Sequence, residues 1–242
     1  MYQRRAYRTN MGSGRFTSLS LAVGESDLYI GYRGAVEVSA IEQCALKKLR
    51  RLRQEILDYP DHRLLTTLVP LFQHEERSPL LASMLASAEQ ANVGPMAAVA
   101  GAIAQELGRH LRSAYPLTEL VIENGGDLYL FLTEPLPVKL LAPSSPFSNK
   151  LALMANGEIG IATSSATMGH SLSFGRADAV MVAALDAALA DALATSYCNR
   201  VQCNDDAQPL CQALTAETGV IGAVIAIGDT VAIGGSLEVC HL

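Results

Sequence analysis

A short polar segment, Asn124-Gly125-Gly126-Asp127, separates two runs that are typical of β-strands. The two adjacent glycines let the backbone turn sharply and let a ligand approach the main-chain amides. Asp127 can accept hydrogen bonds, take a proton or face a metal ion. The same four residues also suit an ordinary β-turn, so the motif by itself leaves a ligand site and a plain turn open.

A second segment carries three consecutive hydroxyl groups, on Thr163, Ser164 and Ser165, directly after a predicted strand. Small hydroxyls and amides at the end of a strand can converge on phosphate oxygens, although an ordinary Ser/Thr turn is the other interpretation. His170 follows a few residues later. It could serve as a general acid or base near neutral pH, or be a surface residue of a loop.

The third segment is Ala190–Thr195, which reads Ala-Asp-Ala-Leu-Ala-Thr. Asp191 and Thr195 are four residues apart, so on a helix they share one face. A carboxylate and a hydroxyl among alanines leave room for a hard cation such as Mg²⁺ and for its phosphate ligand. The alternative is an Asp on the solvent side of an amphipathic helix. An unpaired carboxylate would be costly among the small apolar residues near Asp191, and the motif by itself leaves both interpretations open.

The elements that must position these residues follow from two periodicities. Apolar residues at three- and four-residue steps predict helices over 36–59, 79–91, 96–111, 186–199 and 205–218. Alternating or continuous apolar runs predict strands over 15–23, 27–32, 119–124, 128–133, 138–142, 158–163, 178–185, 220–227 and 230–234. Because helices and strands interleave irregularly, we expect an α+β fold with mainly antiparallel sheets packed with helices.

Two details of the helices bear on the site. Ser78 and Pro79 predict the start of the 79–91 helix, as its N-cap and first residue. Gly101 lies inside the 96–111 helix, where glycine costs about 1 kcal/mol relative to alanine. We therefore expect another backbone or a ligand to come close to Gly101, and we include it among the candidate binding residues.

Composition excludes several classes of protein. The chain has 242 residues, is 50% hydrophobic and carries a formal net charge of −6, which argues against a disordered polymer and against a polyanion-binding protein as a whole. Basic residues gather in 1–63. We interpret them as a solvated helix face, with a contact to nucleic acid or phosphate as the alternative. We expect no nucleic-acid partner.

Five scattered cysteines, an odd number, argue against a disulfide framework and fit a reducing compartment. The N-terminus shows no secretory signal, and the most apolar stretches are too short or too charged to cross a bilayer. We therefore expect a cytoplasmic protein with no membrane partner. It should form a single domain, 1–242, with a loose N-terminal arm over 1–11. The apolar hairpin at 220–234 could pair across a homodimer.

The order of these weak signals resembles the ApbE-like superfamily, the FAD:protein FMN transferases once linked to thiamine biosynthesis. The chain looks most similar to a compact bacterial and archaeal branch of it. Two stretches carry that resemblance, Val93–Gly101 and Gly160–Asp178. The resemblance implies an ApbE-like (T-fold-like) α+β architecture and a small-molecule phosphate ligand, with FAD as ligand or substrate and Mg²⁺ as the metal.

The resemblance also assigns roles to residues. It implies catalytic residues Asp127 and His170 and metal ligands Asp191 and Thr195. It places Gly125, Gly126, Thr163 and Ser164 at the flavin site, and the motifs themselves add Asn124, Gly101 and Ser165 to the predicted cofactor-binding set. The chain departs from the transferases where they carry an Asp-Pro-Arg-Thr-Gly-like turn and a Lys-Gly-Tyr-Ala segment. Two functions follow: a Mg²⁺-dependent enzyme that cleaves FAD to FMN and AMP, or a non-catalytic pocket for a flavin, nucleotide or phosphorylated metabolite.

Overall fold

The computed structural model describes residues 14–72, 78–142, 144–167 and 174–242. The predicted arm over 1–11 and the candidate His170 lie outside the described residues. In the described ranges, no helix is long and apolar enough to cross a membrane.

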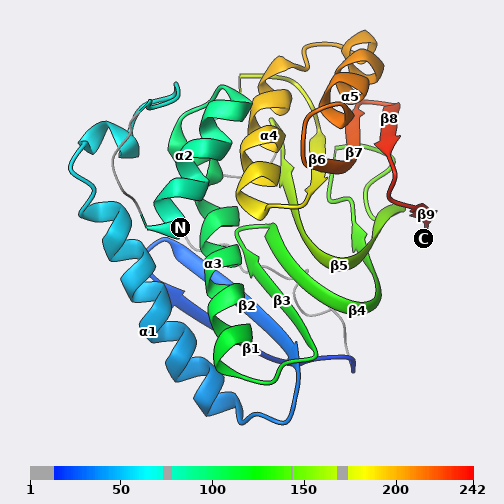
Figure 1. Cartoon of the computed structure of the whole chain (residues 1–242). Coiled ribbons are helices and arrows are strands. Elements are labelled where there is room, and N and C mark those ends of the chain that lie inside the picture. The colour runs from blue at the N-terminus through cyan, green and yellow to red at the C-terminus, as the bar shows by residue number, and fades with distance from the viewer. Residues whose placement is uncertain (1–13, 73–77, 143, 168–173) are drawn as a thin grey trace.

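A single nine-stranded sheet forms the centre of the described structure (Figure 1). Every pairing between its strands is antiparallel, which confirms the predicted α+β class with mainly antiparallel sheet. The strands run in chain order from β1 to β8, and β9 pairs with β5. Their bounds are β1 Thr17–Val23, β2 Ser26–Arg33, β3 Glu119–Asn124, β4 Asp127–Lys139, β5 Leu151–Ser164, β6 Ala179–Ala184, β7 Val220–Ile227, β8 Thr230–Gly235 and β9 Val239–His241.

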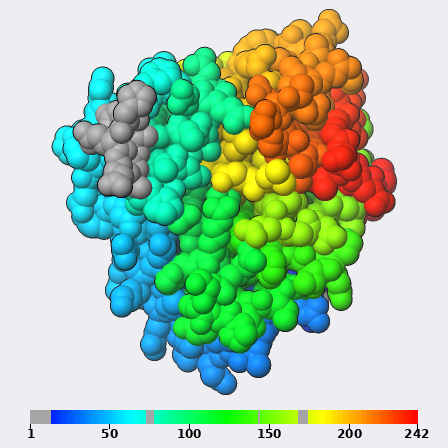
Figure 2. Space-filling model, viewed as in Figure 1, coloured from blue at the N-terminus to red at the C-terminus, as the bar shows by residue number. Residues whose placement is uncertain are grey.

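The helices cover one face of this sheet, from α1 at the left of Figure 1 to α5 at the upper right, and they form much of the surface seen in Figure 2. A large apolar core lies between helices and sheet, and a smaller one lies on the opposite sheet face. The helices are α1 Val38–Leu57, α2 Pro79–Ala91, α3 Val99–Ala114, α4 Ala187–Arg200 and α5 Ala207–Thr215, with short 3₁₀ turns η2 His62–Leu65, η3 Pro95–Ala98 and η4 Asn204–Asp206.

The predicted boundaries were wrong along β4 and β5. Two separate strands were predicted over 128–133 and 138–142, yet one strand, β4, continues through Pro135 and Pro137 to Lys139, and β5 begins at Leu151 rather than at 158. The pairing with β5 shifts register between Leu132 and Leu136. Beyond Phe131 no β3 residue pairs with β4, so the outer half of β4 is a sheet edge, where a proline costs no ladder hydrogen bond.

Two glycines allow the start of α4 to pack closely between α3 and β5. A Cβ on Gly101 of α3 would lie 2.1 Å from the carbonyl oxygen of Ala187, and a Cβ on Gly160 of β5 would lie 2.2 Å from its Cα. Both glycines therefore allow backbones to approach at distances that any side chain would prevent. The backbone approach expected at Gly101 is that of α4.

A buried polar junction holds the same helix end. Asp186 caps α4 by accepting hydrogen bonds from the amides of Ala188 and Leu189. Gln105 of α3, only 1% exposed, donates to the Asp186 carboxylate and accepts from the Ala187 amide at 2.8 Å. These bonds satisfy polar groups that would otherwise be buried without partners, and they set the position of α4 against α3.

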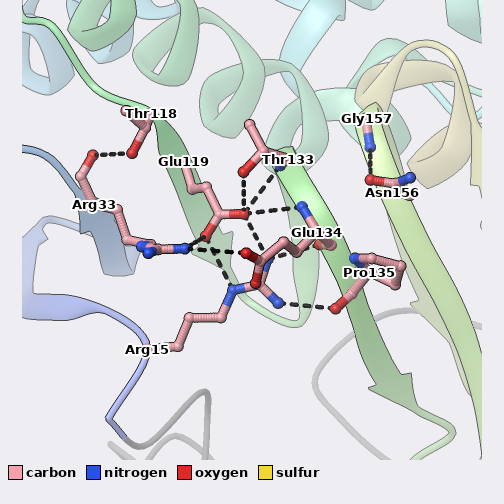
Figure 3. Close-up of polar contacts among 9 residues, drawn as sticks. All are labelled: Arg15, Arg33, Thr118, Glu119, Thr133, Glu134, Pro135, Asn156 and Gly157. Carbon is pink, nitrogen blue, oxygen red and sulfur yellow. Dashed lines mark hydrogen bonds and ion pairs between the residues drawn. The ribbon is translucent and has the colours of Figure 1, made fainter.

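A second buried carboxylate joins the first strands to the centre of the sheet (Figure 3). Glu119 of β3, fully buried, forms an ion pair with Arg15 and accepts hydrogen bonds from the amide and hydroxyl of Thr133. The Arg15 guanidinium, more than any other group, holds the pKa of Glu119 well below its ordinary value. The pair attaches the segment before β1 to β3, and Arg15 also donates hydrogen bonds to the carbonyl oxygens of Glu134 and Pro135 in β4.

Replacing Gly101 by alanine should destabilise the fold by about 1–3 kcal/mol, because the new methyl overlaps the Ala187 carbonyl. Helix propensity alone predicts the opposite, a gain of about 1 kcal/mol. Urea denaturation of Gly101→Ala decides between the two. Ser113→Ala, on the exposed part of the same helix, is the control and should change stability little. A Gly101→Ala variant more stable than the wild type would contradict the close approach.

Replacing Glu119 by glutamine should lower stability at pH 7 by about 3 kcal/mol, because it leaves a partly buried Arg15 without its counter-ion. Since the pKa of Glu119 is lowered by folding, this stabilisation is present above the ordinary carboxyl pKa and is lost in acid. The matched control is Glu55→Gln, which breaks the exposed pair with Arg51 and should cost below about 0.5 kcal/mol. Equal losses in the two variants, measured by urea titration, would refute this role.

Candidate functional site

The carboxylate of Asp191 lies at the N-terminal end of α3. Its Oδ2 accepts hydrogen bonds from the amides of Ala100 at 3.1 Å and Gly101 at 3.0 Å. The first amides of a helix have no partner within the helix and favour a negative charge. A side chain of α4 thus satisfies the first turn of α3.

Asn124, at the end of β3, reaches the same turn. Its amide Nδ2 donates to the carbonyl oxygen of Ala100 at 3.1 Å. Ala100 is therefore held from two sides, by Asn124 through its carbonyl and by Asp191 through its amide. Figure 1 shows the start of α3, the β3–β4 turn and the start of α4 gathered at the centre of the view.

The β3–β4 turn is a tight glycine turn. Gly125 and Gly126 have φ angles of 74° and 113°, a region that L side chains rarely adopt. The amide of Gly126 donates to the Glu123 carboxylate at 2.7 Å. A Cβ on Gly126 would meet nothing within 4 Å, so the space beside the turn is open in the described structure.

Sheet register brings Asp127 to the end of β5. Leu128 pairs with Ile161, so Asp127, one residue back, lies beside Ala162. Side chains alternate along a strand, and the buried Tyr129 and Ala162 belong to the core under the helices. Asp127 is two residues before Tyr129, and Ser164 is two residues after Ala162, so both side chains lie on the helix side of the sheet. Asn124 lies on the same side, because it is two residues after Ile122 of that core.

The three predicted hydroxyls do not act alike. Thr163 pairs with Met181 of the core on the opposite sheet face, and alternation places its side chain on that face. Ser165 lies just beyond β5 and interacts with Thr167, whose hydroxyl contacts the buried Asp178 at 3.4 Å. Of the three hydroxyls, only that of Ser164 belongs to β5 and lies on the helix side of the sheet.

Helix α4 lies along the end of β5. At its start Ala187 contacts Gly160, and near its end the Cys198 carbonyl would be 1.8 Å from a Cβ on Gly175. The segment at Gly175 leads to Ala177, whose carbonyl accepts from the amide of Ala166, just after β5. Helix α4, which carries Asp191 and Thr195, thus runs along the end of β5.

Burial governs the charge of Asp191. A small part of the residue is accessible, yet loss of solvent around the carboxyl raises its pKa to about 7, against the lowering effect of the amides of Gly101 and Ala100. Among the described residues, one carboxylate oxygen of Asp191, Oδ1, and the Thr195 hydroxyl have no hydrogen-bond partner.

The described residues contain no group of three His, Cys, Asp or Glu side chains that could hold a metal ion by themselves. Any cation at Asp191 and Thr195 would complete its shell with ligand or water oxygens, as Mg²⁺ does. The predicted catalytic residue His170 lies outside the described residues.

Glu123 was missed by the sequence analysis. Its buried carboxylate accepts from the Gly126 amide and so shapes the turn that presents Asp127. In the sequence, the only sign of this role was a carboxylate placed three residues before a glycine.

A cavity of about 520 Å³ lies elsewhere, lined by Arg176, Gln202, Cys203, Asn204, Asp205 and Ile227, and by no predicted site residue.

Replacing Asp191 by asparagine should make stability less sensitive to pH. The folded carboxyl keeps its proton to about pH 7, whereas the unfolded one loses it near 3.8. Ionisation therefore opposes folding increasingly over that range, and Asp191→Asn should gain about 2–3 kcal/mol on the wild type between pH 5 and pH 8. Denaturant titrations at both pH values measure this gain. Asp205→Asn, an exposed carboxylate, is the control. If the free energy of unfolding of Asp191→Asn differs from that of the wild type by the same amount at pH 5 and pH 8, the raised pKa of Asp191 is contradicted.

The sequence matches the family model described as AbpE bacteria over residues 8–219. The UPF0280 protein of Methanocaldococcus jannaschii is 35% identical over 204 residues, 81% of each chain. The UPF0280 protein of Methanopyrus kandleri is 34% identical over 226 residues, 90% of each chain.

Solved structures share the fold at low identity. The flavin transferase ApbE from Vibrio cholerae has a TM-score of 0.66 at 12% identity, covering 91% of this chain and 97% of that one. The flavinyl transferase ApbE of Pseudomonas stutzeri has a TM-score of 0.62 at 11% identity, covering 90% and 94%. The family match and the two archaeal relatives together show that this chain belongs to the AbpE bacteria family, and its architecture is ApbE-like.

Proposed function

We propose that this chain binds a flavin or nucleotide diphosphate together with Mg²⁺ beside the first turn of α3, and that it cleaves FAD to FMN and AMP. One observation carries the proposal: Asp191 and Thr195 present two oxygens without hydrogen bonds in the described part of the chain, four residues apart on a helix that runs along the end of β5. The flavin transferases named above have this fold, which supports the choice of ligand.

The donor set fits Mg²⁺. Asp191 Oδ1 is an open oxygen of a largely desolvated carboxyl, and a cation beside it would favour the ionised form that burial opposes. The Thr195 hydroxyl, four residues on, adds a neutral oxygen of the kind hard cations accept. When bound there, Mg²⁺ would neutralise negative charge on a diphosphate.

Other residues would position the ligand. The Ser164 hydroxyl, on the helix side of β5, can donate to a phosphate oxygen, and the open space beside Gly126 admits a ligand near the turn. The Gly126 amide is already bound to Glu123, so the role of Gly125 and Gly126 in this proposal is to leave room rather than to donate hydrogen bonds.

Cleavage requires a base near the diphosphate. Asp127, half-buried on the same side of the sheet, would take the proton of an attacking water or of a hydroxyl on an acceptor protein. The new oxygen–phosphorus bond forms at the FMN phosphate, the diphosphate bond breaks, and AMP leaves with the bonding electrons. Water as the acceptor gives free FMN, and a protein hydroxyl gives a flavinylated protein.

A second candidate is a pocket that binds such a ligand without cleaving it. The hydrogen bonds of Asn124 and Asp191 to Ala100 favour this alternative, because both side chains are already engaged in holding the first turn of α3. In that case the residues orient a ligand and stabilise the fold, and no base is needed.

Incubating the protein with FAD and Mg²⁺ tests both functions. We expect FMN and AMP to form, detected by chromatography, and FAD with Mg²⁺ to raise the melting temperature by about 5–10 °C at a hundredfold excess over the dissociation constant. Asp191→Asn and Thr195→Val should remove the Mg²⁺-dependent part of the shift, whereas Asp205→Asn and Thr66→Val, both exposed, should keep it.

The outcomes separate the candidates. A Mg²⁺-dependent shift without AMP supports the binding pocket and refutes cleavage. Loss of AMP release in Asp127→Asn, with the shift retained, supports Asp127 as the base. No shift with FAD, FMN or ADP, with or without Mg²⁺, would refute both functions.

A further inference from the structure

A cluster of titratable groups lies between α1 and α3, away from the site described above. Cys44 of α1 places its Sγ 3.5 Å from Nε2 of His110, near the end of α3. Cys44 is half-buried and His110 is exposed, so small molecules in solution can reach the contact. A thiol in contact with an imidazole can give its proton to the ring nitrogen.

Tyr115 closes the other side of the cluster. Its hydroxyl donates to the carbonyl oxygen of Ala40, one helical turn before Cys44, at 3.1 Å. The tyrosine also interacts with the Cys44 thiol, which after desolvation is the next cause that raises the pKa of Tyr115. Two polar side chains, an imidazole and a phenol, thus contact one thiol.

Two basic side chains lie near the cluster, Lys48 and Arg51, and Arg51 is paired with Glu55. Lys48 lies four residues after Cys44 on the same face of α1, and Arg51 follows one turn later. Desolvation first, then Lys48 and Arg51, lowers the pKa of His110, which leaves the imidazole neutral and able to accept a proton at pH 7.

The other cysteines lack this combination. Cys198 and Cys211 are buried, and burial raises the pKa of Cys211 to about 11. Cys240 packs against the sulfur of Met154 at 3.5 Å. Cys203 is exposed but precedes two aspartates, and the backbone amide of Cys203 donates to the Asp206 carboxylate.

We propose that Cys44 is a modification site that reacts with small disulfides to form a mixed disulfide, with His110 as its proton acceptor. The Cys44 thiol passes its proton to His110 Nε2, and its sulfur attacks one sulfur of the disulfide. The new sulfur–sulfur bond forms as the old one breaks, and the released thiolate recovers a proton from His110. This site is independent of the proposed flavin chemistry.

The neutral disulfide dithiodipyridine tests the proposal on the full chain at pH 7. We expect one thiol to react about tenfold faster than the others, and a short pulse followed by peptide mass spectrometry to place the label on Cys44. This mapping uses the wild-type protein and does not depend on any variant folding.

Variants then assign the roles. Cys44→Ser should abolish the fast phase, and His110→Gln should slow it about fivefold while the slower thiols react as before. Cys203→Ser, which removes an exposed thiol, should leave the fast phase unchanged. A pulse label on another cysteine, or a His110→Gln variant as fast as the wild type, would overturn the proposal.

Discussion

The described structure depends on how the backbone groups in the first turn of α3 obtain hydrogen-bond partners. A helix begins with amides that have no partner of their own, and here two of them bind the carboxylate of Asp191. Asn124 holds the same turn from β3 through the Ala100 carbonyl. These bonds join a sheet strand, α3 and α4 at one point, and the glycines that flank Ala187 allow the backbones to come close enough for them to form.

The same carboxylate serves stability and the proposed chemistry in opposite ways. Burial raises the pKa of Asp191 to about 7, so near neutral pH an ionised Asp191 opposes folding. A cation at its open oxygen would relieve that cost and would make the ionised form the stable one. Under the proposed function, metal binding, proton release and stability would therefore be linked at this residue.

The sequence predicted the order of helices and strands well where periodicity was long. The helix at 79–91 and the strand at 119–124 agree with α2 and β3 to the residue. The predicted strand bounds were wrong along β4 and β5. Pro135 and Pro137 are typical of a loop, and only the structure shows that β3 no longer pairs with β4 beyond Phe131, so that prolines are tolerated there. The sequence analysis also missed the pairing of Arg15 with Glu119, because charges 104 residues apart leave no local pattern.

The sequence by itself determined which residues share a helix face, such as Asp191 and Thr195, and which segments turn sharply, because both follow from local backbone geometry. Only the tertiary structure decided that Asn124 and Asp191 meet at Ala100, that Thr163 lies on the sheet face opposite Ser164, and that Gly101 makes room for Ala187. Strand register and the approach of distant backbones set these positions, and neither is written in any short stretch of the chain.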